Sequence, residues 1–316
     1  MPDYLPTATL EMLARRAELL RQVRQFFEGR GFLEVETPLL SHDVVVDRHL
    51  DPLSVTLFAD PRQPERGQKL WLQTSPEFAM KRLLAAGATA IYQVTKAFRG
   101  GEAGGLHNPE FTIVEWYRVG DDYAAGMQLL SDLAEWVLGP GSAERLTYRD
   151  AFQRQVGFDP LEPGAKLPLP LGMPKDADRE LILDDYLTSL IAPYLGLDRP
   201  VILHDYPASQ AALARVRPGD PPLAERFELY FHGLELANGY HELLDPAILR
   251  ERNRANNTER FADDKYLLPE DSRLLAAMDY GLPPCSGCAL GFDRLVMVAT
   301  GAKAIQEVMA FPIDRA

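Results

Sequence analysis

The chain has 316 residues, 46% of them hydrophobic, which is enough to bury a sizeable core in one or two domains. Acidic side chains outnumber basic ones by 46 to 33, and the formal charge of −13 argues against binding nucleic acid through a broad basic surface. No apolar run approaches the roughly 18 residues of a membrane span, and no signal peptide is evident, so we expect a cytoplasmic protein.

The first part of the chain predicts a long helix followed by several strands. Apolar residues recur at helical spacing from Leu10 to Phe27, and the glycines at 29 and 31 can end that helix. Strands are predicted at 32–36, 70–73, 90–98 and 111–119, with a shorter helix at 76–86.

The second part is less regular. Proline and glycine are frequent over 139–175 and an acidic, helix-compatible stretch follows, so we predict an irregular insertion at about 139–200. Further elements are expected as strands at 201–204 and 227–236 and a helix at 267–280. Because strands mostly succeed one another through short loops, the pattern predicts a single α+β domain over 1–316, a mainly antiparallel sheet flanked by helices.

Residues 287–294 read G-C-A-L-G-F-D-R, a strand of small residues that leads into a helix. Gly287, Ala289 and Gly291 share one strand face, which lets a ligand approach the backbone, and Arg294 then adds a guanidinium at a helix N-terminus. Phosphate is the expected ligand. A core strand before a surface helix is the alternative. The C-S-G-C at 285–288 could be a redox pair or half of a zinc site, but no second pair completes four ligands.

Residues 98–117 predict two strands around a glycine-rich loop. Alternation places Phe111, Ile113, Glu115 and Tyr117 on one face of the second strand. An aromatic surface beside a carboxylate and an arginine suits a ligand with a flat base, a phosphate and an ammonium group. The alternative is a structural hairpin with a solvated loop, although Glu115 on an apolar face needs a partner.

Residues 226–242 contain two glutamates that a hairpin would bring together. With a turn at His232-Gly233, Tyr230 pairs with Glu235 and Leu229 with Leu236. Glu228 and Glu235 then lie diagonally on one face, within about 7–8 Å, and suit Mg²⁺ carried by a nucleotide. Strict alternation would place the polar residues at 238, 240 and 242 on the other face, so the turn chemistry of Ala237-Asn238-Gly239 must redirect the chain if all of them serve one pocket. A solvated pair of glutamates is the alternative.

Together these segments resemble class II aminoacyl-tRNA synthetases, most closely the lysyl branch. Residues 10–38 look like the first motif of that class, which builds the dimer interface in the family, residues 98–117 like the second and residues 287–294 like the third. Residues 74–77 and 235–242 look like the lysine-specific elements. The resemblance implies the class II catalytic fold, ATP and Mg²⁺ as cofactors, and a homodimer.

The chain begins at the first motif, so we expect no anticodon-binding domain. In this it is similar to the elongation factor P β-lysine ligases, a family that activates (R)-β-lysine as an adenylate and joins it to a lysine side chain of elongation factor P. The resemblance implies an AMP-forming ligase that uses no tRNA and has no membrane partner. Two alternatives remain: a truncated synthetase that acts on tRNA or a free amino acid, and a non-catalytic regulatory paralogue, which should have lost its arginines or carboxylates.

The resemblance also implies roles for individual residues. Arg99 would bridge the substrate carboxylate and the α-phosphate, while Arg294 would hold the γ-phosphate and stack on adenine opposite Phe111. The other ATP contacts would come from Gly100, Gly101, Glu102, His107, Asn108, Glu228, Leu229 and Gly291, with Mg²⁺ on Glu228 and Glu235. The substrate would meet Glu77, Glu115, Tyr117, Asn238 and Glu242, in a pocket lined by Ser75, Pro76, Glu235, Tyr240 and Ala289.

Three places depart from lysyl-tRNA synthetases. Residues 99–102 read R-G-G-E where those enzymes have Arg-x-Glu, so the backbone at Gly101 is the expected substitute for the adenine contact of that glutamate. Leu106 stands where they have a loop arginine. Ala289 stands where they have glycine, and its methyl group would crowd an α-ammonium while tolerating one on the β-carbon.

Overall fold

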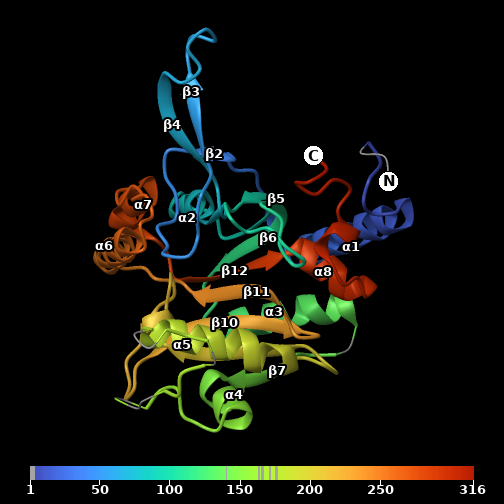
Figure 1. Cartoon of the computed structure of the whole chain (residues 1–316), viewed down its shortest axis with the longest axis vertical. Helices are drawn as coiled ribbons and strands as arrows, with labels where there is room; N and C mark the ends of the chain where they lie inside the picture. The colour runs from blue at the N-terminus through green and yellow to red at the C-terminus, as the bar shows by residue number, and fades with distance from the viewer. Residues whose placement is uncertain (1–3, 140, 163, 165–166, 171, 175–176) are drawn as a thin grey trace. The chain divides into compact units, whose positions relative to one another are not determined.

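The computed structural model describes residues 4–139, 141–162, 164, 167–170, 172–174 and 177–316. The chain forms two compact units. Unit 1 comprises Met1–Gly120, Leu244–Pro284 and Ala289–Ala316, and unit 2 comprises Asp121–Leu243 and Cys285–Cys288. Helices accompany mainly antiparallel sheet in each, as predicted for an α+β protein (Figure 1).

The main sheet of unit 1 carries a long, uninterrupted hairpin. Strand β1 (Leu33–Glu34) pairs in parallel with β5 (Ala90–Phe98), and β5 pairs antiparallel with β6 (Glu110–Val119). A second sheet of this unit has the order β2-β4-β3, with bounds Leu40–Ser41, Gly67–Leu72 and Ser54–Phe58. Strands β3 and β4 form the hairpin at the top of Figure 1.

The helices of unit 1 are α1 (Leu10–Glu28), α2 (Glu77–Ala85), α6 (Pro246–Ala262), α7 (Arg273–Gly281) and α8 (Phe292–Thr300), followed by a short 3-10 turn at Ile305–Val308. The long first helix was expected from its periodicity, which is confirmed. Helix α6 was not expected, because its buried side is largely polar: Leu249, Asn253, Asn257 and Arg260.

The core of unit 1 forms where α1 meets the sheet. Leu19, Val23 and Phe27 are fully buried along one side of the helix. The Phe27 ring stacks on Tyr92 with 4.7 Å between ring centroids and lies 5.1 Å from Trp116. Each such apolar side chain stabilises the fold by about 1.5–3 kcal/mol, so this contact fixes the back of the hairpin that carries the candidate site.

Unit 2 is built on the strand order β11-β10-β8-β7. These strands span Leu234–His241, Leu223–Phe231, Val201–Pro207 and Glu144–Thr147, and β9 (Val216–Arg217) adds to β10. Strand β7 is parallel to β8, and the other neighbours are antiparallel. The helices are α3 (Tyr123–Leu138), α4 (Tyr148–Gln155) and α5 (Arg179–Asp185), with a π-helix at Tyr186–Ile191.

The stretch expected to be irregular contains regular elements among its described residues. Helix α4 buries Tyr148 and Phe152, which join Leu183 and Ile191 in the core of unit 2. This spacing is helical, but the segment is short and its surroundings are rich in proline, so the periodic signal is weak. Positions 140, 163, 165–166, 171 and 175–176 of the stretch lie outside the described residues.

Strand β12 (Cys285–Gly291) begins in unit 2 and ends in unit 1, and it leads directly into α8. Cys285 and Cys288 are both buried, and neither forms a disulfide. Among the described residues, no helix combines the length and the apolar character needed to cross a membrane.

Candidate active site

In unit 1, the loop between β5 and β6 carries the first arginine that the sequence singled out. The Arg99 amide donates to the carbonyl of Pro109 at 2.9 Å, which closes the base of the loop. Its guanidinium lies over the Phe111 ring, 5.0 Å from the centroid, and its Nη1 is 3.8 Å from a Glu102 carboxylate oxygen. The loop therefore presents a cation against an aromatic face, as a nucleotide site requires.

The second arginine is fixed from the first turn of α8. Arg294 Nη2 is 2.5 Å from His107 Nε2, and its Nε donates to the Leu106 carbonyl at 3.4 Å. Burial, and then the charge of Arg294, lower the pKa of His107, so the imidazole is neutral near pH 7 and accepts from the guanidinium. The structure thus brings together Arg294 and His107, two residues that the sequence analysis assigned to the nucleotide, and that assignment stays a prediction.

Asp293 and Arg16, which sequence reasoning missed, together hold α8 in place. Asp293 is buried, accepts from the Thr112 amide of β6 at 2.7 Å and pairs with Arg16 of α1 at 2.6 Å. Asn108 was expected to touch ATP, but its side chain bonds the Glu110 carbonyl and the Ile313 amide. Its role toward the nucleotide stays a prediction.

A buried carboxylate forms the other part of the site in unit 1. Glu115 is 1% exposed and accepts from the Ser75 hydroxyl at 2.7 Å and from the Tyr117 hydroxyl at 2.6 Å. Burial, and next the charge of Glu77, raise the pKa of Glu115 to about 7, against the lowering effect of these two hydrogen bonds and of Lys81. A carboxylate on an apolar strand face needs partners, and those of Glu115 are Ser75 and Tyr117. Both residues were predicted to belong to the substrate pocket.

Glu77 has a cationic partner that the sequence analysis did not name. Lys81 lies one turn along α2 and its Nζ is 2.5 Å from the Glu77 carboxylate, with both side chains almost completely buried. The Ser75 hydroxyl also accepts from the Glu77 amide at 3.0 Å, next to Pro76 at the start of the helix. Glutamate and lysine at i and i+4 of a predicted helix are a readable signal for this pair.

In unit 2, β10 and β11 form the predicted two-residue turn at His232-Gly233, where both residues have positive φ, 49° and 75°. The predicted pairing of Tyr230 with Glu235 is confirmed. The predicted pairing of Leu229 with Leu236 is wrong, because Leu229 lies opposite Ala237 and the register shifts between 229 and 230. An extra residue in β11 at this bulge changes which side chains share a face.

The bulge corrects the expected split of the polar residues. Asn238 lies directly opposite Glu228 and donates to it at 3.1 Å, so the two share a face instead of lying on opposite faces. Tyr240 pairs with Arg226 two positions further along, and Glu235 with Tyr230 on the other side. Alternation along β10 places Arg226 and Tyr230 on the same face as Glu228, so their partners Tyr240 and Glu235 lie on that face too.

Glu228 is 3% exposed, which excludes the solvated-glutamate interpretation for this residue, while Glu235 is half-buried. Its carboxylate accepts from Arg226 at 2.5 Å, Tyr206 at 2.5 Å, Tyr230 at 2.6 Å and Asn238. Burial first, and then the Glu228 charge, raise the pKa values of both tyrosines well above their usual range. They therefore remain donors at any physiological pH.

The hard carboxylate oxygens of Glu228 and Glu235 fit Mg²⁺ in kind. Within the described part of the chain, no group of three or more histidine, cysteine, aspartate or glutamate side chains is arranged to hold a metal. Further ligands would have to be phosphate oxygens and water, as expected for an ion bound with a nucleotide. To bind the ion, the Glu228 carboxylate would have to give up the hydrogen bond from one of its four donors.

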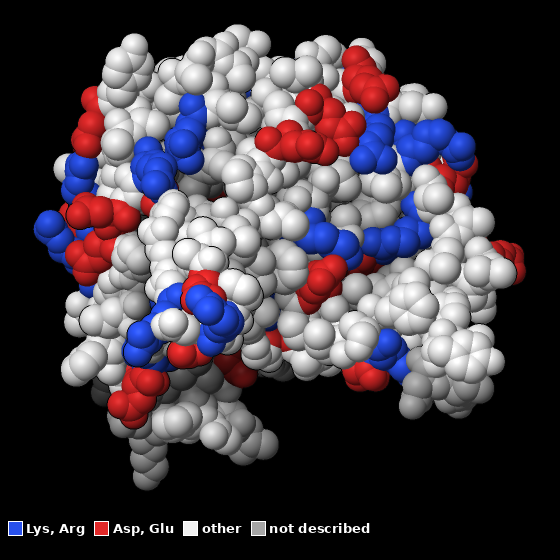
Figure 2. All heavy atoms as spheres, turned by 90° about the horizontal axis from the view of Figure 1, so that it is seen from above, with Lys and Arg blue, Asp and Glu red and all other residues white. Residues whose placement is uncertain are grey.

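The remaining predicted residues have clear places. Gly291 caps the N-terminus of α8, Ala289 is half-buried on β12, and Leu229 lies in the core of unit 2. Glu242 is buried, and its amide donates to the Cys285 carbonyl at 3.0 Å. Figure 2 shows basic side chains interspersed with acidic ones on the face it presents.

Comparison with known proteins agrees with this fold. The family model of class II tRNA synthetases (D, K and N) matches residues 3–315. The chain therefore belongs to the class II tRNA synthetase family. Curated relatives named elongation factor P–(R)-β-lysine ligase include those of Vibrio cholerae, 48% identical over 99% of both chains, and of Klebsiella pneumoniae strain 342, 45% identical over 99% of this chain and 98% of its own. That of Actinobacillus succinogenes is 46% identical with the same coverage, 99% and 98%.

Proposed function

We propose that this protein activates (R)-β-lysine with ATP and joins it to a lysine side chain of elongation factor P. Identities of 44–48% over nearly the whole chain with ligases of that name support the proposal. The observation that carries it is the buried carboxylate of Glu115, held by Ser75 and Tyr117 beside the Glu77–Lys81 pair. A buried carboxylate in that setting recognises an ammonium group, as a diamino acid substrate requires.

Activation begins when the substrate carboxylate attacks the α-phosphate of ATP, and pyrophosphate leaves. This step needs no general base, because a carboxylate is already ionised at neutral pH. Arg99 bridges the two reacting groups and offsets the negative charge that develops on the phosphate, and Arg294 orients the nucleotide from α8. His107 is neutral and fixes the Arg294 guanidinium.

Glu228 and Glu235 would hold Mg²⁺ in this proposal, and the ion would supply positive charge for the phosphate groups of ATP. Arg226, Tyr206 and Tyr230 donate to the Glu228 carboxylate and fix its orientation. In the second step an amine of elongation factor P attacks the mixed anhydride and AMP leaves. Because the attacking group is an amine, the new bond is an amide, and no charged tRNA is formed.

We also propose a homodimer formed through α1 and the strand after it. Leu10 and Leu33 are 79% and 63% exposed, and apolar side chains at that exposure suit a protein interface. Sedimentation equilibrium of the whole protein tests this, and a monomer at micromolar concentration would contradict it.

The substrate is tested in two stages. ATP–pyrophosphate exchange with (R)-β-lysine and with α-lysine should show much faster exchange with the β-isomer. Incubation with unmodified elongation factor P should then add the mass of one lysyl residue to that protein. Formation of aminoacyl-tRNA with no gain of mass on elongation factor P would instead support a truncated tRNA synthetase. An absence of exchange with every amino acid would support a non-catalytic paralogue.

A further inference from the structure

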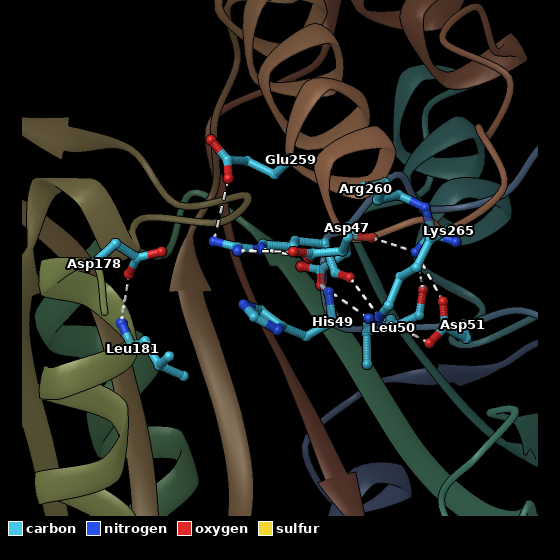
Figure 3. A network of polar contacts seen from close by, with 11 residues as sticks. Asp47, His49, Leu50, Asp51, Asp178, Leu181, Glu259, Arg260 and Lys265 are labelled. Carbon is cyan, nitrogen blue, oxygen red and sulfur yellow. Dashed lines mark hydrogen bonds and ion pairs between the residues drawn. The ribbon is translucent and has the colours of Figure 1, made fainter. Parts of the chain in front are cut away.

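The C-terminal end of α6 buries an arginine that none of the proposed steps uses. Arg260 is 0% exposed, and the residues one and two turns before it on the same side, Asn257 and Asn253, are also buried. Both asparagines bond backbone carbonyls of 268–270, which holds the helix to the following loop. Arg260 instead faces a different segment, residues 47–51 (Figure 3).

The guanidinium of Arg260 meets several acceptors at once. Nη1 donates to the carbonyls of Asp47 at 2.9 Å and Leu50 at 3.1 Å and lies 3.0 Å from the Asp51 carboxylate, while Nε donates to the Tyr266 carbonyl at 3.0 Å. Lys265, which is more exposed than Arg260, contacts the same Asp51 carboxylate at 3.0 Å. Three of these acceptors lie at Nη1, and the Tyr266 carbonyl lies at Nε, on the other side of the guanidinium. A lysine has a single nitrogen and cannot reach both positions, so Lys is not equivalent to Arg here.

The segment held by Arg260 touches the catalytic loop through its backbone. The Asp51 carbonyl accepts from the Gly100 amide at 2.6 Å. A Cβ on Gly100 would lie 3.1 Å from that carbonyl oxygen and 3.2 Å from a methyl group of Leu53, closer than most real Cβ contacts, so one of these neighbours would have to move. Gly100 directly follows Arg99, so this contact fixes the backbone from which the reacting guanidinium projects.

The loop needs such a support because of its composition. Residues 100–105 contain four glycines, whose conformational freedom must be restricted for Arg99 to keep one position. The far side of the loop is held by the Ile305 amide on the Gly105 carbonyl at 2.7 Å and by Gln306 on the Gly104 carbonyl at 3.0 Å. On the Arg99 side, Asp51 supplies the corresponding contact.

We propose that Arg260 is a positioning residue for adenylation, acting on Arg99 through the 47–51 segment and the Gly100 amide. A buried cation is not needed to fill this space, since an apolar side chain of similar volume does so without the desolvation of a charge. What the guanidinium adds is a fixed geometry for the Asp51 carbonyl. The inference rests on the proposed function, because Arg99 is assigned to the reacting phosphate there.

The test compares Arg260→Met, Arg260→Lys and Asp51→Asn with the matched control Arg48→Met. Arg48 joins the same segment to the same helix end through Asp263 at 2.8 Å and Glu259 at 3.3 Å, but at the surface. We expect Arg260→Met to lower kcat for ATP–pyrophosphate exchange by about 10- to 100-fold, the effect of a small displacement of a reacting group. The KM for the amino acid should stay within about threefold, because Glu77 and Glu115 are not displaced, and Arg48→Met should change neither parameter by more than that.

Arg260→Lys should recover only part of kcat, and Asp51→Asn should lose less than Arg260→Met because the carbonyl contacts of Arg260 remain. Gly100→Ala disturbs the same contact from the loop side, so its effect on kcat and that of Arg260→Met should be strongly non-additive in the double variant. A thermal melt will show whether Arg260→Met folds. If it does not, the same comparison is made with Asp51→Asn in its place, and the effects of Asp51→Asn and Gly100→Ala on kcat must be non-additive in the double variant.

Normal kcat in folded Arg260→Met, additive effects of Arg260→Met and Gly100→Ala, or an equal loss in Arg48→Met, would each overturn the proposal. Failure of the proposed function gives a different result, in which the unmodified protein itself shows no exchange with any amino acid.

Discussion

The buried carboxylate of Glu115 predicts a pH dependence of substrate binding. Its pKa of about 7 lies well above the ordinary value of 4.5, chiefly because burial disfavours the charged form and because Glu77 is nearby. An ammonium group binds the ionised carboxylate, so it must displace the proton wherever Glu115 is protonated in the free protein. Binding should therefore weaken as the pH falls through 7.

The magnitude follows from the fraction ionised. About one Glu115 in ten is ionised at pH 6 and about nine in ten at pH 8. The dissociation constant for the diamino acid should then be about tenfold higher at pH 6 than at pH 8, since one pH unit below the pKa corresponds to one factor of ten. Side-chain ammonium groups of the lysine type, with pKa near 10.4, stay charged over this range.

Isothermal titration calorimetry in buffers of different ionisation enthalpy measures both the affinity and the protons released. We expect release of about 0.9 proton per site at pH 6 and about 0.1 at pH 8, because binding deprotonates Glu115. Glu115→Gln should bind weakly and without this pH dependence. Proton release that does not change between pH 6 and 8, or a tenfold change that persists in Glu115→Gln, would refute the reasoning.

Other changes test neighbouring parts of the site. Lys81→Met should move the midpoint of that pH dependence upward, because Lys81 lowers the pKa of Glu115; a midpoint that stays or falls contradicts this. Arg294→Ala should reduce kcat for exchange by about 100- to 1000-fold with little change in the melting temperature. Glu235→Gln should raise the Mg²⁺ concentration needed for half-maximal exchange, and an unchanged requirement would remove this residue from the metal site. Ala289→Gly should improve exchange with α-lysine relative to (R)-β-lysine, and an unchanged ratio would show that the methyl group is not the selector.

The hairpin of unit 2 shows where sequence reasoning stops. The turn at His232-Gly233 was predictable because turn chemistry is local, and the residues nearest it pair as expected. The bulge three residues later depends on packing instead. Gly239 has no room for a Cβ, which would meet the Phe227 ring at 2.3 Å and the Gly287 carbonyl at 3.0 Å. That constraint comes from residues far along the chain, so period-two alternation placed Asn238 on the wrong face.

Helix α6 was missed for a related reason. Hydrophobic periodicity identifies helices whose buried side is apolar, whereas here the buried side carries Asn253, Asn257 and Arg260. Their hydrogen bonds go to backbone of 47–50 and 266–270, segments that have no regular structure of their own. A helix that serves to hold loops in this way has no amphipathic pattern, although its start is readable from Asp245 before Pro246.

The charges around Glu115 explain why so many polar groups lie in the core of unit 1. Lys81 offsets the charge of Glu77, and the Ser75 and Tyr117 hydroxyls stabilise the Glu115 carboxylate without neutralising it. One negative charge is therefore left for a ligand, and one ammonium group completes the balance. A neutral side chain of the same length would leave that carboxylate desolvated and without a cation, so discrimination against it arises from the unpaired charge more than from shape.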